Sequence, residues 1–281
     1  MIPQRNLSLL SNRLAKDHGR RLPEAILERD YCLAWFLVAL SRSPLREALA
    51  FKGGTVLRRC YLPDYRFSED LDFTMTSAMP FETIRLSLDE VFVEAQRASG
   101  IRFAYSRSSS HHHINSHTFY LSYQGPLPPT QSAKEVKVDI TINERIVFDL
   151  EDREILAGYQ EYNDLPKAAT IRAYSLNEIA AEKVLAMMDR ARNEPRDLYD
   201  VWYLSTDGLV DIGNLREAIE QKLNFRQKQM ADVREEFRAK EKRYRALWAS
   251  RLGNQMVELP DFEDVYRAVQ RHLRQAGLFD Q

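Results

Sequence analysis

Two neighbouring segments constrain the fold of this chain more than any other part of its 281 residues. In the first, the apolar residues 49–51 run into Lys52-Gly53-Gly54-Thr55, after which apolar residues resume helical spacing. This order predicts a short strand, a glycine turn and a helix. In the second, residues 70–75 alternate polar with apolar side chains, which predicts a strand whose Asp70 and Asp72 share one face. We therefore expect a sheet that carries two carboxylates close in sequence to a glycine turn.

The rest of the first half continues the pattern of helices and strands. Apolar residues recur at helical spacing over residues 23–40 and 81–98, which predicts two amphipathic helices. Further strands are predicted at residues 101–105, 118–123 and 136–142. Residues 1–165 are thus expected to form a mixed β-sheet domain flanked by helices.

The second half has helical patterns only. Ser175 and Glu178 have the spacing of a capping box, which predicts that a helix begins there and covers residues 176–192. A second helix is predicted at residues 197–204, and helical patterns continue to the end of the chain. The expected fold class is therefore α/β (α+β), with a mostly helical domain over residues 166–281.

Composition and charge exclude several classes of protein. Forty Lys and Arg against 41 Asp and Glu leave a formal charge of -1, so a nucleic-acid site would need local segregation of charge. Cys32 and Cys60 are too few for a disulfide framework or a four-thiolate zinc site. The longest apolar run, residues 31–40, is too short to span a bilayer. We expect a compact protein of the cytoplasm with no membrane partner.

The glycine turn has the chemistry of a phosphate site. Gly53 and Gly54 free the backbone to approach an anion, and Thr55 adds a hydroxyl at a helix start, where peptide N–H groups favour phosphate. A Gly-Gly pair alone is usually only a turn. Its position just before a pair of aspartates favours the functional interpretation.

The strand aspartates have the chemistry of a metal site. Asp70 and Asp72 would repel each other in a dry site unless a divalent cation lies between them, and Mg²⁺ suits such oxygen ligands. Asp139, flanked by Val138 and Ile140 on a later strand, is the candidate third metal ligand, and three carboxylates can hold two ions for transfer of a phosphoryl group. The alternative without a function is that these carboxylates only face solvent.

Two residues of the helical half also fit a site. Lys183 falls within the apolar stripe of its predicted helix, so it should face the interior and needs either a structural carboxylate or a nucleotide phosphate. Asp197 follows Pro195 at a helix start, where it would cap the helix or complete a site. Asp200 lies one turn further and could pair with Arg192 or Arg196.

These motifs together resemble a known family. The residues that carry the resemblance are the string Phe51-Lys52-Gly53-Gly54-Thr55, then Arg66, Ser68, Asp70 and Asp72, and the later segments 178–186 and 196–201. They resemble the AbiEii/AbiGii toxins within the polymerase-β-type nucleotidyltransferase superfamily. The resemblance implies an enzyme that transfers a nucleoside monophosphate from an NTP to a hydroxyl, with Mg²⁺ or Mn²⁺ as cofactor and pyrophosphate as product.

The resemblance also implies residue roles and partners. It implies that Asp70, Asp72, Lys183 and Asp197 are catalytic, with Lys183 on the triphosphate. It further implies nucleotide binding by Arg66 and Ser68, although a serine before a strand is also a routine turn residue. A toxin of a toxin–antitoxin or phage-defence module is implied, with a cognate antitoxin and the tRNA 3′ end as acceptor.

Two alternative functions use the same residues. The site would equally serve transfer to a protein or to a small molecule such as an antibiotic. A catalytically inactive nucleotide-binding protein is the other alternative, and the presence of Asp70, Asp72, Asp139 and Lys183 argues against it.

Two further patterns need an interpretation. His111, His112, His113 and His117 border a serine-rich stretch, so we expect a solvated loop and no metal site. Residues 221–251 contain ten basic and four acidic residues with Phe225, Phe237, Tyr244 and Trp248 between them. This predicts a basic helical surface, suited either to RNA or simply to solvent.

Overall fold

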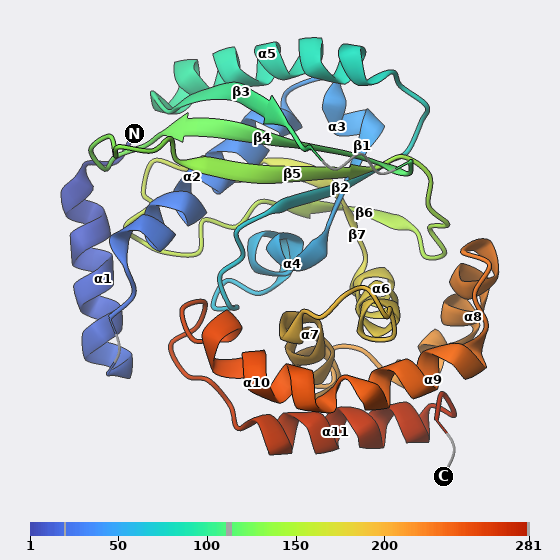
Figure 1. Cartoon of the computed structure of the whole chain (residues 1–281). Helices are drawn as coiled ribbons and strands as arrows, with labels where there is room; N and C mark the ends of the chain where they lie inside the picture. The colour runs from blue at the N-terminus through green and yellow to red at the C-terminus, as the bar shows by residue number, and fades with distance from the viewer. Residues whose placement is uncertain (20, 111–113, 280–281) are drawn as a thin grey trace. The chain divides into compact units, whose positions relative to one another are not determined.

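The computed structural model describes residues 1–19, 21–110 and 114–279, which form two compact units (Figure 1). The first unit comprises Met1–Glu144 and Leu150–Ala173, and the second comprises Arg145–Asp149 and Tyr174–Gln281. The division expected after residue 165 thus lies at Ala173 in the structure, and a short earlier segment also joins the second unit. Over the described residues, the helices are all too short or too polar to cross a membrane.

The first unit is built on one mixed seven-stranded sheet, in the order β3-β4-β5-β2-β1-β7-β6. The strands are β1 (Leu49–Lys52), β2 (Leu71–Met75), β3 (Arg102–Ser108), β4 (Ser116–Gln124), β5 (Glu135–Thr141), β6 (Leu150–Glu154) and β7 (Thr170–Tyr174). β2 runs antiparallel to β1 and parallel to β5, and this brings the two predicted acidic strands next to each other. The expected mixed α/β architecture is confirmed.

The helices of the first unit follow from the same sequence patterns. They are α1 (Gln4–His18), α2 (Glu24–Ser41), α3 (Leu45–Ala48), α4 (Gly53–Val56), η1 (Leu57–Tyr61) and α5 (Phe81–Ser99). α2 and α5 pack against each other, and α5 lies along β3 (Figure 1). The helix expected after the glycine turn is present as a single turn, α4, which continues into the π-helix η1.

Alternation along the strands decides which face of the sheet is buried. On β5, Val136, Val138 and Ile140 are at most 2% exposed, whereas Lys137 and Asp139 between them are half-buried. Because successive side chains of a strand point to opposite faces, one face belongs to the core and the other carries polar residues. The predicted site residues of β2 and β5 lie on that polar face.

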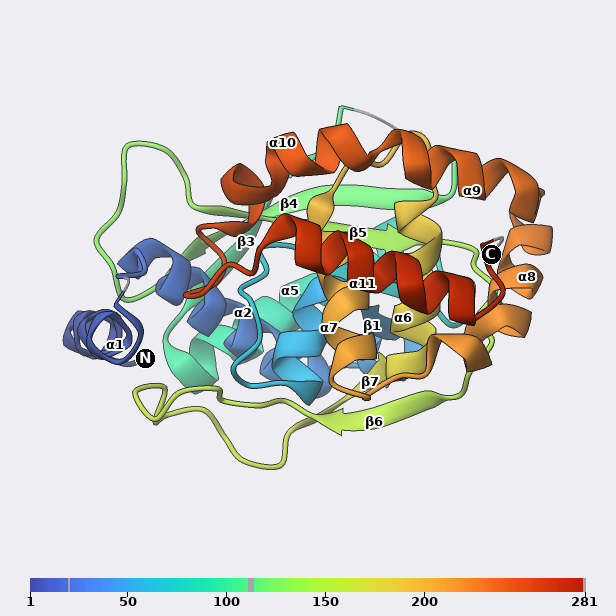
Figure 2. The same ribbon diagram turned by 90° about the horizontal axis from the view of Figure 1, so that it is seen from below.

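The second unit is helical. Its elements are α6 (Leu176–Met187), α7 (Pro195–Thr206), η2 (Ile212–Leu215), α8 (Arg216–Phe225), α9 (Met230–Ala239), α10 (Glu241–Leu252) and α11 (Phe262–Gln275). α7 contacts α6, α10 and α11, so it lies at the centre of this unit (Figure 2). The Ser175 side chain accepts a hydrogen bond from the backbone N–H of Glu178, which confirms the N-terminal cap of α6.

The predicted end of this helix at residue 192 is wrong, because α6 stops at Met187. The Asp189 carboxylate accepts a hydrogen bond from the N–H of Ala191 at 3.0 Å, which favours a turn over helix continuation. Lys240 then donates to the carbonyl oxygens of Met187 and Arg192, each at 2.8 Å, and to that of Asp189. The buried ammonium of Lys240, which lies between α9 and α10, thereby satisfies the carbonyl groups left open where α6 ends.

Candidate active site

The glycine turn is in close contact with Asp72, one of the predicted metal ligands. Gly53 has φ of +83°, a conformation that favours glycine, and a Cβ atom built on it would lie 2.3 Å from Oδ2 of Asp72. β1 and β2 create this proximity, because Lys52 is the register partner of Asp72. Only glycine fits at this position, so the sequence motif has a steric reason.

The second glycine accommodates two more of the predicted residues. A Cβ on Gly54 would lie 2.8 Å from Nη2 of Arg66 and 3.2 Å from Oγ of Ser68. Thr55 donates its hydroxyl hydrogen bond to the carbonyl oxygen of Asp70, which ties the turn to the start of β2. The structure therefore brings the nucleotide-binding candidates of the first unit together. It also shows the Thr55 hydroxyl bonded within the protein, and a phosphate contact of this hydroxyl stays a prediction.

The third predicted metal ligand, Asp139, lies on the strand next to Asp72, and both of its oxygens have partners within the protein. Asp139 is the register partner of Asp72 across β2 and β5, whereas Asp70, expected on the same strand as Asp72, lies one residue before β2 begins. One oxygen of Asp139 accepts a hydrogen bond from the Thr118 hydroxyl, and the other forms an ion pair with the Lys137 ammonium. Sequence reasoning missed Lys137, although its spacing of two residues from Asp139 placed both on one face.

The carboxylates on this face of the sheet affect the pKa of the Lys137 ammonium. Burial lowers the pKa of Lys137, but its hydrogen bond to Asp139 and the attraction of Asp139, Asp70 and Asp72 outweigh that effect, so the pKa is raised. The ammonium group therefore stays charged at neutral pH beside the carboxylates.

Asp70 and Asp72 have the ligand chemistry that Mg²⁺ requires. Both are half-buried carboxylates, Asp72 on β2 and Asp70 just before that strand begins, and Gly53 leaves room beside Oδ2 of Asp72. Across the residues that the structure describes, no three His, Cys, Asp or Glu side chains are grouped closely enough to hold a metal ion. Asp70 and Asp72 would therefore hold a cation as a pair, whereas the predicted metal role of Asp139 would require Lys137 to move.

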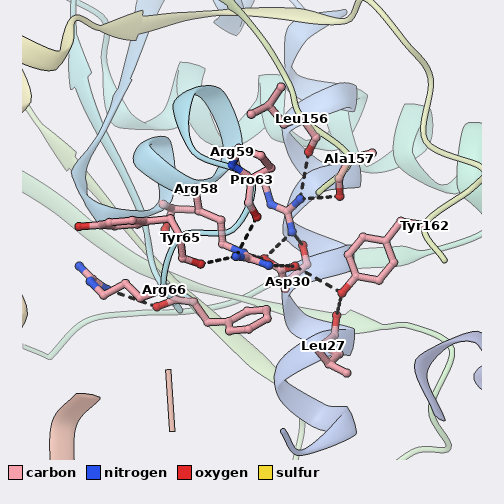
Figure 3. A network of polar contacts seen from close by, with 12 residues as sticks. Leu27, Asp30, Arg58, Arg59, Pro63, Tyr65, Arg66, Leu156, Ala157 and Tyr162 are labelled. Carbon is pink, nitrogen blue, oxygen red and sulfur yellow. Dashed lines mark hydrogen bonds and ion pairs between the residues drawn. The ribbon is translucent and has the colours of Figure 1, made fainter. Parts of the chain in front are cut away.

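A buried ionic network, which sequence reasoning missed, holds the segment between the two motifs (Figure 3). The Arg58 guanidinium lies 2.8 Å from Oδ1 of Asp30 and donates to the carbonyl oxygens of Pro63, at 3.2 Å, and Tyr65. Its Cζ atom lies 3.9 Å from the centre of the Phe67 ring. Arg58 thus contacts Pro63, Tyr65 and Phe67 and holds the segment that carries Arg66 and precedes Ser68.

A second arginine completes this network. Arg59 donates to the carbonyl oxygens of Leu156, at 3.1 Å, and Ala157, at 3.2 Å, and pairs with Asp30 (Figure 3). Burial raises the pKa of Asp30, but the two arginines outweigh it and lower the pKa overall. The sequence analysis did not use the one available signal, which is that two adjacent arginines lie in the apolar stretch after the glycine turn and would need an internal carboxylate.

We expect Arg58→Met to destabilise the chain by about 3–5 kcal/mol, because it removes one partner of a buried ion pair. The midpoint of urea unfolding measures this loss. Arg85→Met is the control, since the Arg85 side chain is 41% exposed and pairs only on the surface with Glu82. Equal midpoints for both variants would show that the Arg58 network does not hold this segment.

We expect Gly53→Ala to displace Asp72 as well as to strain the backbone. Gly208 is the matched control, because it has φ of +68° but nothing within 4 Å of an added Cβ. Both variants should lose about 1–2 kcal/mol from the left-handed conformation. Only Gly53→Ala should also weaken Mn²⁺ binding, measured by titration. If Gly208→Ala and Gly53→Ala bind Mn²⁺ alike, the glycine turn does not shape the metal site.

The second unit contains the other predicted catalytic residues in a buried ionic cluster. Nζ of Lys183 on α6 lies 2.8 Å from Oδ1 of Asp197 and 2.7 Å from Oδ2 of Asp200, both on α7. Nε of Arg192 lies 2.5 Å from the other oxygen of Asp197. Lys183 is 7% exposed and the two aspartates at most 1%, so the predicted inward position of the lysine is confirmed.

The anions beside Lys183 are carboxylates, which was one of the two alternatives left open by the sequence. Burial raises the pKa of Asp197, but Lys183 and Arg192 outweigh it, so the pKa lies far below its usual range. Asp200, for which pairing with Arg192 or Arg196 was expected, pairs with Lys183, whereas Arg192 pairs with Asp197 and Arg196 pairs with Glu194. A contact of Lys183 with a nucleotide phosphate stays a prediction.

The predicted basic surface over residues 221–251 is wrong in part. Lys222 and Lys240 are buried, and Lys222 lies 2.6 Å from both Glu178 and Glu182. Three of the four aromatic residues, Phe237, Tyr244 and Trp248, belong to the core, whereas Phe225 is 43% exposed. The exposed basic side chains that remain include Arg238, Lys242, Arg243, Arg245 and Arg251. Arg245 pairs with Glu241 and Glu263, so it adds little free positive charge.

The histidine and cysteine predictions have separate outcomes. His111, His112 and His113 lie outside the described residues. His117 on β4 packs its ring 4.8 Å from that of Phe81, and burial lowers its pKa. Cys32 and Cys60 are free and buried, as expected for a chain without a disulfide framework.

The strand β1, the glycine turn and the helix α4 are followed by the antiparallel strand β2, with Asp70 just before it and Asp72 on its polar face, and this is the arrangement expected of a nucleotidyltransferase. The chain belongs to the family described as nucleotidyl transferase AbiEii toxin of type IV toxin–antitoxin systems, whose sequence profile matches residues 35–270. It is therefore a nucleotidyltransferase toxin, as the resemblance implied, and the family implies a nucleotide substrate and a cognate antitoxin.

Solved structures share the fold at low sequence identity. MenT4, a nucleotidyltransferase toxin from Mycobacterium tuberculosis, is 18% identical with a TM-score of 0.54, over 96% of this chain and 94% of that one. JHP933 from Helicobacter pylori is 15% identical with a TM-score of 0.52, over 91% of this chain and 93% of that one. No curated protein sequence matches the chain.

Proposed function

We propose that this toxin transfers a nucleoside monophosphate from an NTP to the 3′-terminal hydroxyl of tRNA, in a reaction that depends on Mg²⁺ and releases pyrophosphate. The observation that carries the proposal is the position of Asp72. It lies next to Gly53 and opposite Asp139, so the predicted phosphate-binding turn adjoins a predicted metal-binding carboxylate. Both substrates belong to the cytoplasm, where we expect the enzyme to act.

The geometry of the first unit supports a role for each of its candidate residues. The backbone at Gly53 and Gly54, with the Arg66 guanidinium and the Ser68 hydroxyl next to it, would bind the triphosphate. Asp70 and Asp72 would hold Mg²⁺. When bound, the cation supplies charge neutralisation on the phosphates and activation of the attacking hydroxyl. The acceptor oxygen then replaces pyrophosphate on the α-phosphorus.

The roles of Lys183 and Asp197 stay predictions from the family resemblance. A buried lysine held by two aspartates is a rigid cation, and a rigid cation suits a triphosphate because little side-chain entropy is lost on binding. Asp197 would then act through Lys183 as a positioning residue.

The acceptor rests on the family rather than on a described surface. The exposed residues Arg238, Lys242, Arg243 and Arg251 are the basic side chains that would contact an RNA backbone. A protein or small-molecule acceptor would use the same nucleotide site.

The test is incubation of the purified chain with each α-labelled NTP, Mg²⁺ and total cellular RNA. Label should enter RNA of tRNA size, with release of pyrophosphate, and EDTA should prevent it. Oxidation of the RNA with periodate destroys the terminal diol, so it should abolish labelling. Label in protein or in a small molecule would replace the proposed acceptor, and no label with any acceptor would overturn nucleotidyl transfer itself.

A further inference from the structure

Asp139, the predicted third metal ligand, forms a salt bridge with Lys137. Lys137 and Asp139 stand two residues apart on β5, so their side chains share the face on which Asp72 lies opposite Asp139. The Lys137 ammonium contacts one oxygen of Asp139, and the Thr118 hydroxyl, from the adjacent strand β4, contacts the other. Both oxygens of the third carboxylate therefore already accept a hydrogen bond.

The same ammonium is attracted by the other two carboxylates. Asp70 and Asp72 both interact electrostatically with Lys137, in addition to Asp139. A divalent cation that approached Asp139 on this side would meet a positive charge at close range, and like charges at short distance in a partly buried site repel strongly. The side chains of both Lys137 and Asp139 are partly exposed, at 38% and 27%, so the pair lies where an incoming phosphate can reach it.

We propose that Lys137 takes the place of a second divalent cation in this enzyme, with Asp139 and Thr118 as the residues that position it. The inference rests on the proposed nucleotidyl transfer. Asp70 and Asp72 hold one divalent cation, and the fixed ammonium of Lys137 supplies the second positive charge toward the triphosphate. Asp139 then acts through Lys137 instead of binding a metal ion.

The experiment is a titration of the whole chain with Mn²⁺, with and without a non-hydrolysable NTP analogue. The electron paramagnetic resonance signal of free Mn²⁺ measures how much of the ion is bound. The wild type should bind one equivalent. Lys137→Met keeps the apolar stem but removes the charge, so it should gain a second equivalent or bind Mn²⁺ at least about tenfold more tightly. Lys137→Arg keeps the charge and should behave like the wild type.

Two further variants separate the proposal from its alternatives. Asp139→Asn should retain the one equivalent of Mn²⁺ but weaken binding of the NTP analogue, because the ammonium loses its anchor. Lys167→Met, which removes an exposed lysine in the same unit, should change neither quantity. Thermal unfolding of each variant shows that it is folded.

Opposite results would overturn the proposal. Two equivalents of Mn²⁺ in the wild type, with loss of one in Asp139→Asn, would make Asp139 a metal ligand. Unchanged Mn²⁺ and nucleotide binding in Lys137→Met would remove Lys137 from the site. Failure of the proposed function is distinguishable, since Asp70→Asn would then leave Mn²⁺ binding intact, and the titration needs no acceptor.

Discussion

Asp72→Asn and Asp70→Asn are each expected to lower nucleotidyl transfer by about 10³-fold or more, because each removes one of the two carboxylates proposed to hold Mg²⁺. Stability should not fall. Asp70 and Asp72 are separated by one residue, and loss of one negative charge relieves repulsion between them in the metal-free chain. The rate of label transfer and the midpoint of thermal unfolding, measured on the same preparations, separate the two effects.

Asp152→Asn is the matched control for this pair. Asp152 lies on β6 of the same sheet, its side chain is 57% exposed, and it pairs with Arg46 on the surface. Activity should be unchanged in this variant. Full activity in either Asp70→Asn or Asp72→Asn would contradict the metal site, and an equal loss in Asp152→Asn would show that the assay reports general damage.

Local patterns in the sequence predicted the part of the site that short-range geometry builds. The alternation over residues 70–75 and 136–142 placed Asp72 and Asp139 on the faces of their strands, because side-chain direction in a strand depends only on position. Gly53 and Gly54 marked the turn for a similar reason, since a glycine is needed where another side chain occupies the space of a Cβ. The family resemblance supplied the pairing of these motifs.

Partners from distant parts of the chain were not predictable in the same way. Lys222 and Lys240 looked like surface charges, yet Glu178 and Glu182 pair with the first, and carbonyl oxygens at the end of α6 accept from the second. Arg58 likewise finds Asp30, which is 28 positions away. Composition shows the charge of such residues but not their burial, because burial depends on which helices pack together.

Lys183→Met is expected to lower stability as much as Arg58→Met does. Methionine suits the apolar stripe of α6, but the substitution takes the ammonium away from two carboxylates that are at most 1% exposed. Breaking a buried ion pair by removal of one partner costs about 3–5 kcal/mol. The midpoint of urea unfolding should therefore fall, with the slope of the transition unchanged.

A combined variant separates this structural effect from a role in nucleotide binding. Lys183→Met with Asp197→Asn and Asp200→Asn removes the buried negative charges together with the ammonium, so much of the stability should return. Binding of the NTP analogue should remain weak in the combined variant if Lys183 contacts the triphosphate. Wild-type nucleotide affinity in the combined variant would make the cluster purely structural.

The pH dependence of unfolding checks the same cluster through Asp197. Its pKa in the folded chain lies below the value of about 3.9 typical of an unfolded chain, so its charged form stabilises the fold. That contribution is complete above the unfolded pKa and is lost as the pH falls below about 4. Lys183→Met weakens the attraction that lowers this pKa, so the variant should lose less stability than the wild type on acidification. Parallel curves of unfolding free energy against pH for the two proteins would show that Lys183 does not stabilise the charged form of Asp197.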